Sequence, residues 1–148
     1  MTNFKEFLKQ NDDKIRRAAS ANTVLNYNVA AVIKKDCMDV KYGEIWFAKI
    51  PSEVDVNKTI SGIVIVLDSE TFQVLVAKVS KVSDMKYDYF DLPILYWQEC
   101  NLKFESSARM SQTLYLPRTA FTFKIGELLE YDLKAIQEPF RRLINSKE

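Results

Sequence analysis

The chain has 148 residues, of which 47% are hydrophobic and 28% charged, with a formal net charge of +1 at pH 7. These values are typical of a globular protein with its own core, and they leave no global charge that would indicate a nucleic-acid partner. Histidine is absent, which excludes His-based triads, a His general base and His-ligated metals. With only three glycines, glycine-rich loops that cradle phosphates are excluded too.

The two cysteines, Cys37 and Cys100, are far apart in the chain and indicate no disulfide framework. No secretory signal is recognised at the start of the sequence, and no apolar run approaches the ~18 residues of a membrane span. We therefore expect a cytoplasmic protein that does not enter a membrane. We expect no cofactor and no metal, because zinc would need two distant cysteines and carboxylates as ligands.

Residues 3–36 are predicted to be helical. Phe4, Phe7 and Leu8 form an apolar stripe at helical spacing, and 11–13 is an Asn-Asp-Asp sequence that can break and recap a helix. A second apolar set continues the helical spacing: Val24, Leu25, Val29, Val32 and Ile33. The pattern predicts two helices or one bent helix, with its apolar stripe packed within the molecule. We assign residues 1–40 to a helical extension and 41–148 to the main domain.

From Lys41 onward the pattern is typical of β-structure. Residues 44–50 are rich in aromatic and branched side chains and end at Pro51, after which a polar loop extends to Lys58. The apolar run 63–67 predicts a strand buried on both faces, which a turn at 68–71 joins to a strand at 72–80 as a hairpin. Further short strands are predicted at 87–95, 108–110 and 114–116, the last one ended by Pro117.

The C-terminal part predicts one more strand and a helix. Residues 121–125 form the strand, and 130–143 form an amphipathic helix that Pro139 should kink or split. Short strands followed by a helix predict a mainly β fold with helices, in the α+β class. We expect a small, partly open, SH3-like barrel with a C-terminal helix and an N-terminal helical extension.

The order of several short segments resembles the PemK/MazF family of toxins over residues 41–145. These segments are Gly43-Glu44-Ile45-Trp46, the apolar hairpin, Trp97 with Leu102 five residues later, Ser106-Ser107-Ala108-Arg109, and Ile125-Gly126-Glu127-Leu128 ahead of the last helix. The resemblance implies a PemK-type barrel that acts as the toxin of a type II toxin–antitoxin pair. It also implies a homodimer, a cognate antitoxin protein as partner, and metal-independent cleavage of single-stranded RNA by attack of the 2′-hydroxyl.

The resemblance also implies which residues take part. Arg109 stands where the family has its strand arginine and is expected to stabilise the phosphorane, since its fork suits phosphate oxygens. Ser80 matches a strand-end threonine and is expected to help hold the phosphate, so these two are the predicted catalytic residues. Predicted substrate-binding residues complete the set: Glu44, Trp46, Lys58, Ser61 and Ser111. Of these, Glu44 and Lys58 are also candidates for proton transfer.

One departure from the family pattern favours a second interpretation. Many members carry Arg-Pro before the apolar run, whereas this chain has Ser61-Gly62, and Lys58 would supply a charge but no bidentate donor. The alternative is a catalytically impaired binding module on the same barrel, or a gyrase-type (CcdB-like) toxin that acts through protein partners.

Several candidate residues also have plain structural interpretations. Arg109 would pair with a carboxylate such as Glu105, Trp46 and Trp97 would pack in the core, and both cysteines would be inert. The basic segment 14–17 would be the solvated face of a helix rather than a contact to RNA phosphates.

Overall fold

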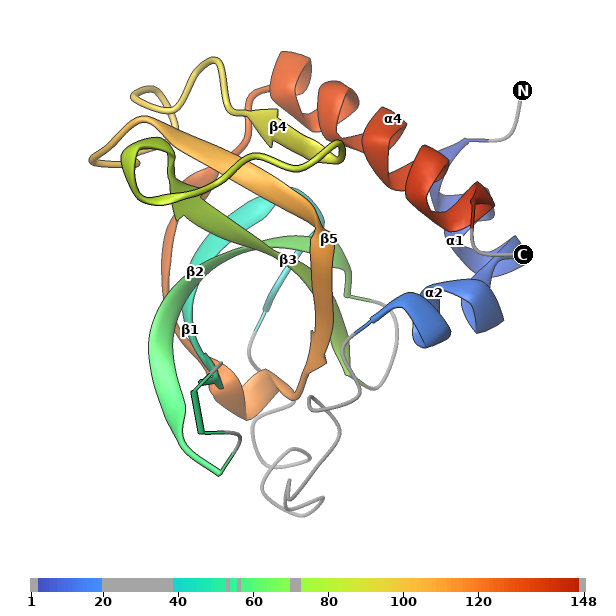
Figure 1. The fold of residues 1–148 in the computed structure, drawn as a ribbon, viewed down its shortest axis with the longest axis horizontal. Helices are drawn as coiled ribbons and strands as arrows, with labels where there is room; N and C mark the ends of the chain where they lie inside the picture. Colours follow the sequence, from blue (N-terminus) through green and yellow to red (C-terminus); the bar gives the residue numbers. More distant parts are fainter. Residues whose placement is uncertain (1–2, 20–38, 53, 56, 70–72, 147–148) are drawn as a thin grey trace.

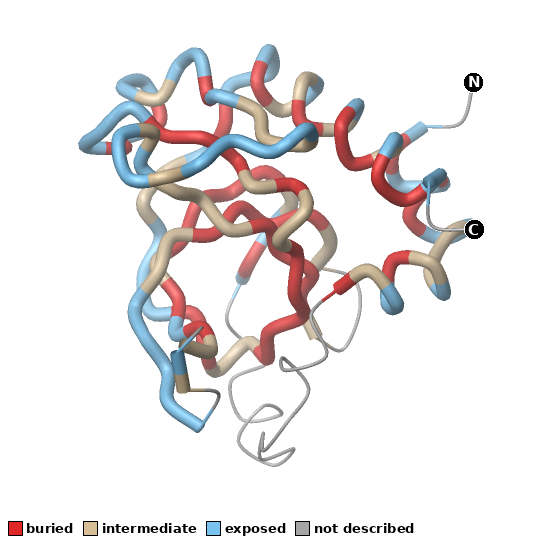
Figure 2. Tube along the Cα trace, in the orientation of Figure 1, coloured by how far each residue is buried: buried red, intermediate tan, exposed pale blue. Residues whose placement is uncertain are grey.

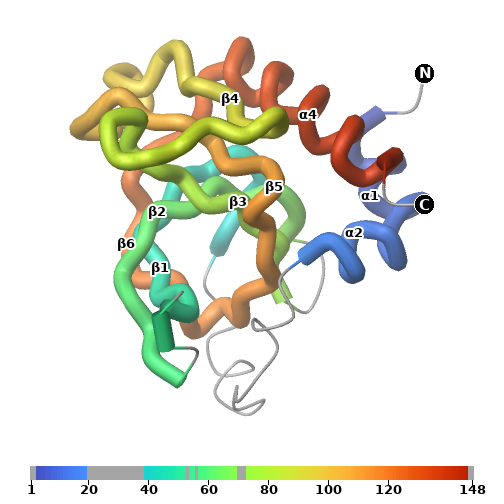
Figure 3. Tube along the Cα trace, in the orientation of Figure 1, coloured from blue at the N-terminus to red at the C-terminus, as the bar shows by residue number. Residues whose placement is uncertain are grey.

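Six antiparallel strands form one curved sheet, in which neighbouring strands follow the order β4-β5-β3-β2-β1-β6 (Figures 1 and 3). The structure is a computed structural model that describes residues 3–19, 39–52, 54–55, 57–69 and 73–146. The strands are β1 (Glu44–Pro51), β2 (Thr59–Asp68), β3 (Val74–Lys81), β4 (Asp91–Pro93), β5 (Ser106–Leu116) and β6 (Phe121–Glu127). The helices of the described residues are α1 (Phe4–Gln10), α2 (Asp12–Ala18) and α4 (Glu130–Asn145).

This architecture confirms the predicted fold class of a mainly β, partly open barrel with a C-terminal helix. The first and last strands of the order, β4 and β6, are not paired with each other, so the barrel is open between them. None of the described helices is both long enough and apolar enough to span a membrane.

The sheet is buried on both faces, as Figure 2 shows along the central strands. On β2, Ile65 and Leu67 join the core beneath the helices, whereas Val64 and Val66 join a second core on the opposite face. All four are at most 1% exposed. Because successive strand residues point to opposite faces, a continuous apolar run is what two-sided burial requires. The prediction for residues 63–67 is confirmed, although β2 begins four residues earlier, at Thr59.

The N-terminal helices pack against α4. Phe140 is fully buried, and its ring lies 6.2 Å from that of Phe4 and 6.5 Å from that of Phe7. The predicted break is confirmed, since α1 ends at Gln10 and α2 begins at Asp12. The apolar stripe of α1 therefore packs within the molecule. The second apolar set (Val24, Leu25, Val29, Val32 and Ile33) and Cys37 lie outside the described residues. The division of the chain at residue 40 stays a prediction.

Three predicted elements differ from the structure. The two short strands expected at 108–110 and 114–116 are one strand, β5, because Met110–Gln112 form an irregularity between the pairs Lys78–Arg109 and Ala77–Thr113. Extra residues on one strand interrupt the pairing without ending it. The strand expected at 87–95 shrinks to β4, since hydrogen bonds within 88–91 form a turn instead.

The prediction that Pro139 splits the last helix is wrong. In Figure 1, α4 is one continuous helix from Glu130 to Asn145, with Pro139 inside it. Pro139 is buried on the packed face of this helix, next to the fully buried Phe140. Burial of the proline ring offsets part of the cost of the missing backbone hydrogen bond.

A buried carboxylate joins the two strands at one edge of the sheet. Glu44, at the start of β1, is 5% exposed and accepts hydrogen bonds from the Lys41 N–H at 2.8 Å and the Trp46 indole at 3.0 Å. Its other oxygen lies 2.9 Å from Nζ of Lys124 on β6. Burial acts to raise the pKa of Glu44, but the bonds from Lys124, Lys41 and Trp46 together hold it below its ordinary value.

We predict that Glu44→Gln lowers the free energy of unfolding at neutral pH by about 1–3 kcal/mol, because the buried charge-assisted bonds are lost. A carboxylate with a depressed folded-state pKa stabilises the protein above its unfolded-state pKa, and this contribution disappears as pH falls through the folded-state pKa. Urea unfolding of both proteins should therefore show a difference at pH 7 that narrows by about pH 3. A difference independent of pH would contradict this assignment.

Candidate functional site

Arg109 and Ser80 come together on neighbouring strands. Arg109 lies opposite Lys78 and Ser80 lies opposite Ser107, so Arg109 and Ser80 share one face of the β3–β5 pair. Nη1 of Arg109 donates to the Ser80 hydroxyl oxygen at 3.3 Å. Both predicted catalytic residues are therefore in contact.

Asp91 of β4 fixes the orientation of this arginine. Nε of Arg109 lies 2.8 Å from the Asp91 carboxylate, and the two side chains are 13% and 0% exposed, respectively. A fully buried carboxylate requires a compensating charge and hydrogen bonds, and Arg109 supplies the charge. The expectation that Arg109 pairs with a carboxylate is thus confirmed, although its partner is Asp91 and not Glu105.

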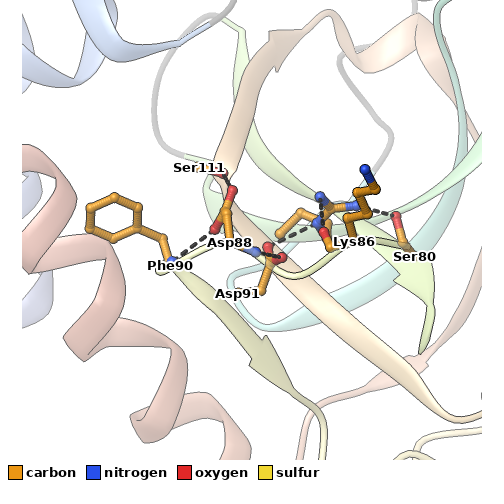
Figure 4. A network of polar contacts seen from close by, with 7 residues as sticks. Ser80, Lys86, Asp88, Phe90, Asp91 and Ser111 are labelled. Carbon is orange, nitrogen blue, oxygen red and sulfur yellow. Dashed lines mark hydrogen bonds and ion pairs between the residues drawn. The ribbon is translucent and has the colours of Figure 1, made fainter. Parts of the chain in front are cut away.

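The 85–90 segment contacts Arg109 through the Lys86 carbonyl on its way to β4, and Figure 4 shows Lys86, Asp88 and Phe90 of this segment together with Asp91. The Lys86 carbonyl accepts a hydrogen bond of 3.3 Å from Nη2 of Arg109, and the Asp88 carboxylate accepts one from the Ser111 hydroxyl. The Asp88 N–H in turn donates to Asp91 at 2.7 Å. Ser80, Arg109 and Ser111, three of the predicted site residues, therefore belong to one polar network.

The carboxylate of Asp88 is ionised at neutral pH. Burial acts to raise its pKa, but the bonds from the Ser111 hydroxyl and the Phe90 N–H and the nearby charge of Arg109 hold the pKa below its ordinary value. The network thus combines a guanidinium, two carboxylates and two hydroxyls.

Four other predicted residues lie outside this network. Glu44 and Trp46 belong to the joint between β1 and β6, and Trp46 is only 7% exposed, its ring packed against Phe121 at 5.8 Å. Lys58 is exposed in the loop before β2, and Ser61 is exposed on β2, where it pairs with Lys49. Their roles in substrate binding stay predictions.

The position of the family's Arg-Pro motif is adjacent to the network. Ile63 pairs with Val79, so in an antiparallel register the preceding residue, Gly62, lies beside Ser80. In that motif the proline falls on Gly62 and the arginine on Ser61, whose side chain alternates to the face that carries Ile63 and Val79. The arginine that the family pattern places at Ser61 would therefore extend from the face opposite to the Arg109 network.

An apolar groove lies on the other face of the same strands. Its volume is about 400 Å³, and Ile63 and Val79 contribute to its lining. Two exposed rings, Phe104 and Phe123, also line the groove. Three lysines contribute as well: Lys81, Lys103 and Lys124. Because Val79 and Ser80 are consecutive in β3, the groove and the Arg109 network open on opposite faces.

The remaining candidates are structural. Trp97 is half-buried against the core beneath the helices, and Cys100 is buried there with its thiol 3.3 Å from the Trp97 carbonyl. Burial raises the pKa of the Cys100 thiol, which keeps it protonated and unreactive at neutral pH. Within the described part of the chain, no three His, Cys, Asp or Glu side chains are grouped closely enough to hold a metal.

The sequence pattern does not reveal Asp88 and Asp91, because it predicts a strand over 87–95, nor Lys86, which takes part through its backbone carbonyl. The spacing of Asp88 and Phe90 was a usable signal, since an Asp side chain often accepts a bond from the backbone N–H two residues later in a turn. Phe90 makes that bond to Asp88 at 2.8 Å. The partnership of Asp91 with Arg109, 18 residues away in sequence, left no local signal.

No protein-family model matches the chain, and neither does any curated protein. Solved structures do match. The Mycobacterium tuberculosis toxin MazF-mt6 is 19% identical with a TM-score of 0.55, and the match covers 69% of this chain and 96% of that toxin.

Two further matches are mycobacterial endoribonucleases. One, in complex with its cognate antitoxin, is 7% identical with a TM-score of 0.58, covering 72% of this chain and 96% of the other. The second is 9% identical with a TM-score of 0.55, covering 74% and 95%. These proteins are matched over nearly their full length, which confirms the predicted resemblance at the level of the fold. The chain has the fold of the PemK/MazF-like toxins.

Proposed function

We propose that this chain is the toxin of a type II toxin–antitoxin pair and an endoribonuclease that cleaves single-stranded RNA without a metal. The observation that carries the proposal is the contact between Arg109 and Ser80 on a fold shared with MazF-type endoribonucleases. Arginine beside a hydroxyl is a suitable pair for a phosphate, because both donate hydrogen bonds to its oxygens.

Among the residues that the structure describes, the donors of this pair are only partly used. Nη1 and Nη2 of Arg109 each carry two N–H groups, and each makes one hydrogen bond to a described residue. The Ser80 oxygen accepts from Arg109, so its own O–H remains available to donate. The Arg109 side chain is 13% exposed, so a phosphate that reaches it would be offered the unused guanidinium N–H groups and the Ser80 hydroxyl as donors.

The reaction that fits these donors begins with the RNA's own 2′-hydroxyl. The 2′-oxygen loses its proton to a base and attacks the adjacent phosphorus, and the bond to the 5′-oxygen breaks as that oxygen takes up a proton. The products are a 2′,3′-cyclic phosphate and a 5′-hydroxyl. Arg109 and Ser80 stabilise the negative charge that builds on the phosphorane oxygens. Glu44 and Lys58 stay the predicted groups for proton transfer.

Partners follow from the same proposal. The substrate is single-stranded RNA, the inhibitor is a cognate antitoxin protein, and the active form is a homodimer in the cytoplasm. One of the matched endoribonucleases was solved in complex with its cognate antitoxin, which supports the expectation of a protein inhibitor.

We predict that the purified protein in EDTA cleaves a long unstructured RNA at discrete positions and leaves 2′,3′-cyclic phosphate ends. Ser80→Ala should slow cleavage roughly 10- to 1000-fold, because one donor to the phosphorane is lost. Arg109→Ala should abolish both cleavage and inhibition of bacterial growth. Rates from gel-resolved time courses test all three expectations.

Two further variants separate catalysis from folding. Arg109→Ala leaves the buried Asp91 without its counter-charge, which can destabilise the fold by about 3–5 kcal/mol. Arg109→Lys keeps a charge for Asp91 but loses the bidentate fork, so it should fold and cleave poorly. Lys134→Ala, which removes a charge from a side chain that is 72% exposed on α4, is the matched control and should cleave normally. Full activity of Arg109→Lys and Ser80→Ala would contradict the assignment.

A second candidate function is a binding module that has lost the chemistry, or a gyrase-type toxin. Three observations favour it. Arg109 is held by the fully buried Asp91, and Ser61-Gly62 stands where many members of the family carry Arg-Pro. In addition, the groove on the opposite face combines an apolar floor with lysines on its rim, as a site for an acidic protein segment would.

The binding-module function predicts the opposite mutational pattern. Phe104→Ala and Phe123→Ala truncate rings that are more than half exposed, so both variants should fold normally and lose growth inhibition. Arg109→Lys should then inhibit growth as the unmodified chain does. A DNA supercoiling assay with purified gyrase would separate the gyrase-type toxin from other binding modules.

A further inference from the structure

Tyr87 is an exposed tyrosine in the backbone segment that contacts the proposed phosphate site. Its exposed fraction is 50%, and among the described residues its side chain has no hydrogen bond and no ring contact. The tyrosine lies between Lys86, whose carbonyl accepts a hydrogen bond from Arg109, and Asp88, both of which are labelled in Figure 4. A ring of this kind, exposed beside a cationic site, is what a base-stacking residue requires.

The backbone on both sides of Tyr87 is held by the network. Before it, the Lys86 carbonyl accepts from Arg109 at 3.3 Å. After it, Asp88 is bonded through its N–H to Asp91 at 2.7 Å and through its carboxylate to Ser111. The ring therefore projects from a backbone that two contacts position relative to Arg109, so little conformational entropy is lost when a ligand contacts it.

The spacing suits one nucleotide. Standard peptide geometry and the Lys86–Arg109 bond together put the Cα of Tyr87 within about 6 Å of Nη2 of Arg109. A phosphate on Arg109 and a base against Tyr87 are then separated by about the distance between a phosphate and the base of the same or the next nucleotide. The exposed Lys86 side chain adds a cation beside the backbone of such a strand.

Other exposed tyrosines differ in one respect, because their rings already have partners. The Arg142 guanidinium lies 5.1 Å from the centre of the Tyr89 ring, and Phe90 meets the same ring edge-on at 5.1 Å. Tyr131, on α4, packs edge-on against Tyr96 at 5.9 Å. Tyr87 is thus the tyrosine of this region whose ring is open to a ligand.

We propose that Tyr87 stacks on the RNA base adjacent to the phosphate held by Arg109 and Ser80. This inference rests on the proposed endoribonuclease function and adds the residue that positions the substrate. Every base offers a π-face, so Tyr87 contributes affinity and placement of the scissile phosphate rather than recognition of one sequence.

The test is equilibrium binding of a fluorescein-labelled, fully 2′-O-methylated single-stranded RNA of mixed sequence, which the protein cannot cleave. Tyr87→Ala and Tyr87→Leu should weaken binding roughly 5- to 150-fold, whereas Tyr87→Phe should stay within about twofold of the unmodified chain. Tyr131→Ala is the matched control and should bind normally. The Phe and Leu variants distinguish stacking from simple packing.

A second measurement uses oligonucleotides that each lack one base. In the unmodified chain, one abasic position should weaken binding, and the same position should have no further effect in Tyr87→Ala. Equal affinity of Tyr87→Ala and the unmodified chain, or equal affinity of the Leu and Phe variants, overturns the role of Tyr87.

Cleavage of unmodified RNA by the wild-type chain in EDTA is measured in parallel. Cleavage with a binding affinity insensitive to Tyr87 refutes this inference alone. Absence of both cleavage and RNA binding in the wild-type chain refutes the proposed function and this inference together.

Discussion

The ion pair between Asp91 and Arg109 holds the candidate site together. Asp91 is fully buried, so its charge is tolerable only beside a cation with good hydrogen-bond geometry. Pairing anchors the short strand β4 on β5, and it aims the remaining nitrogens of Arg109 at Ser80 and at the Lys86 carbonyl. The same carboxylate also accepts from Asp88, which fixes the segment that carries Tyr87. One buried charge thus positions the donors, the hydroxyl and the exposed ring.

Two-sided burial of the sheet explains where functional groups can lie. Apolar side chains occupy both faces of β2 and β3 along most of their length, and the polar groups of the site lie near the end of β3 and at the irregular part of β5. At the end of β3, Ser80 faces the Arg109 network and its neighbour Val79 faces the groove. The last residues of β3 therefore supply side chains to two separate surfaces. One surface is the polar Arg109 network, and the other is the apolar groove with lysines at its edges.

The likeness to MazF-type structures and the departure from the family pattern are compatible. The β3–β5 pair brings Ser80 and Arg109 into contact, whereas Ser61 stands where the family pattern has its other arginine. Arg109 is then the guanidinium in contact with Ser80. Catalysis would then depend on one arginine oriented by a buried carboxylate, a simpler arrangement than a pair of arginines.

The sequence by itself determined the elements whose signals are local. The Asn-Asp-Asp sequence at 11–13 predicted the helix break, apolar patterns predicted the two-sided burial of β2 and the C-terminal helix, and the ordered segments predicted the barrel. Arg109 and Ser80 were predicted as partners in one site, and the structure brings them into contact. Local patterns are reliable here because a strand or helix face must match its own core.

Only the tertiary structure decided the charge partners and the course of β5. Asp91 pairs with Arg109, and Glu44 pairs with Lys124, across separations that no local pattern encodes. The irregularity at Met110–Gln112 likewise depends on how β5 pairs with β3. Pairing with β3 on both sides of the irregularity makes one strand of the two stretches, 108–110 and 114–116, that the sequence pattern predicts as separate strands. Strand register and ion pairing are determined by contacts between segments that are distant in sequence. These contacts stabilise the protein only once the chain has folded, so no local sequence pattern reveals them.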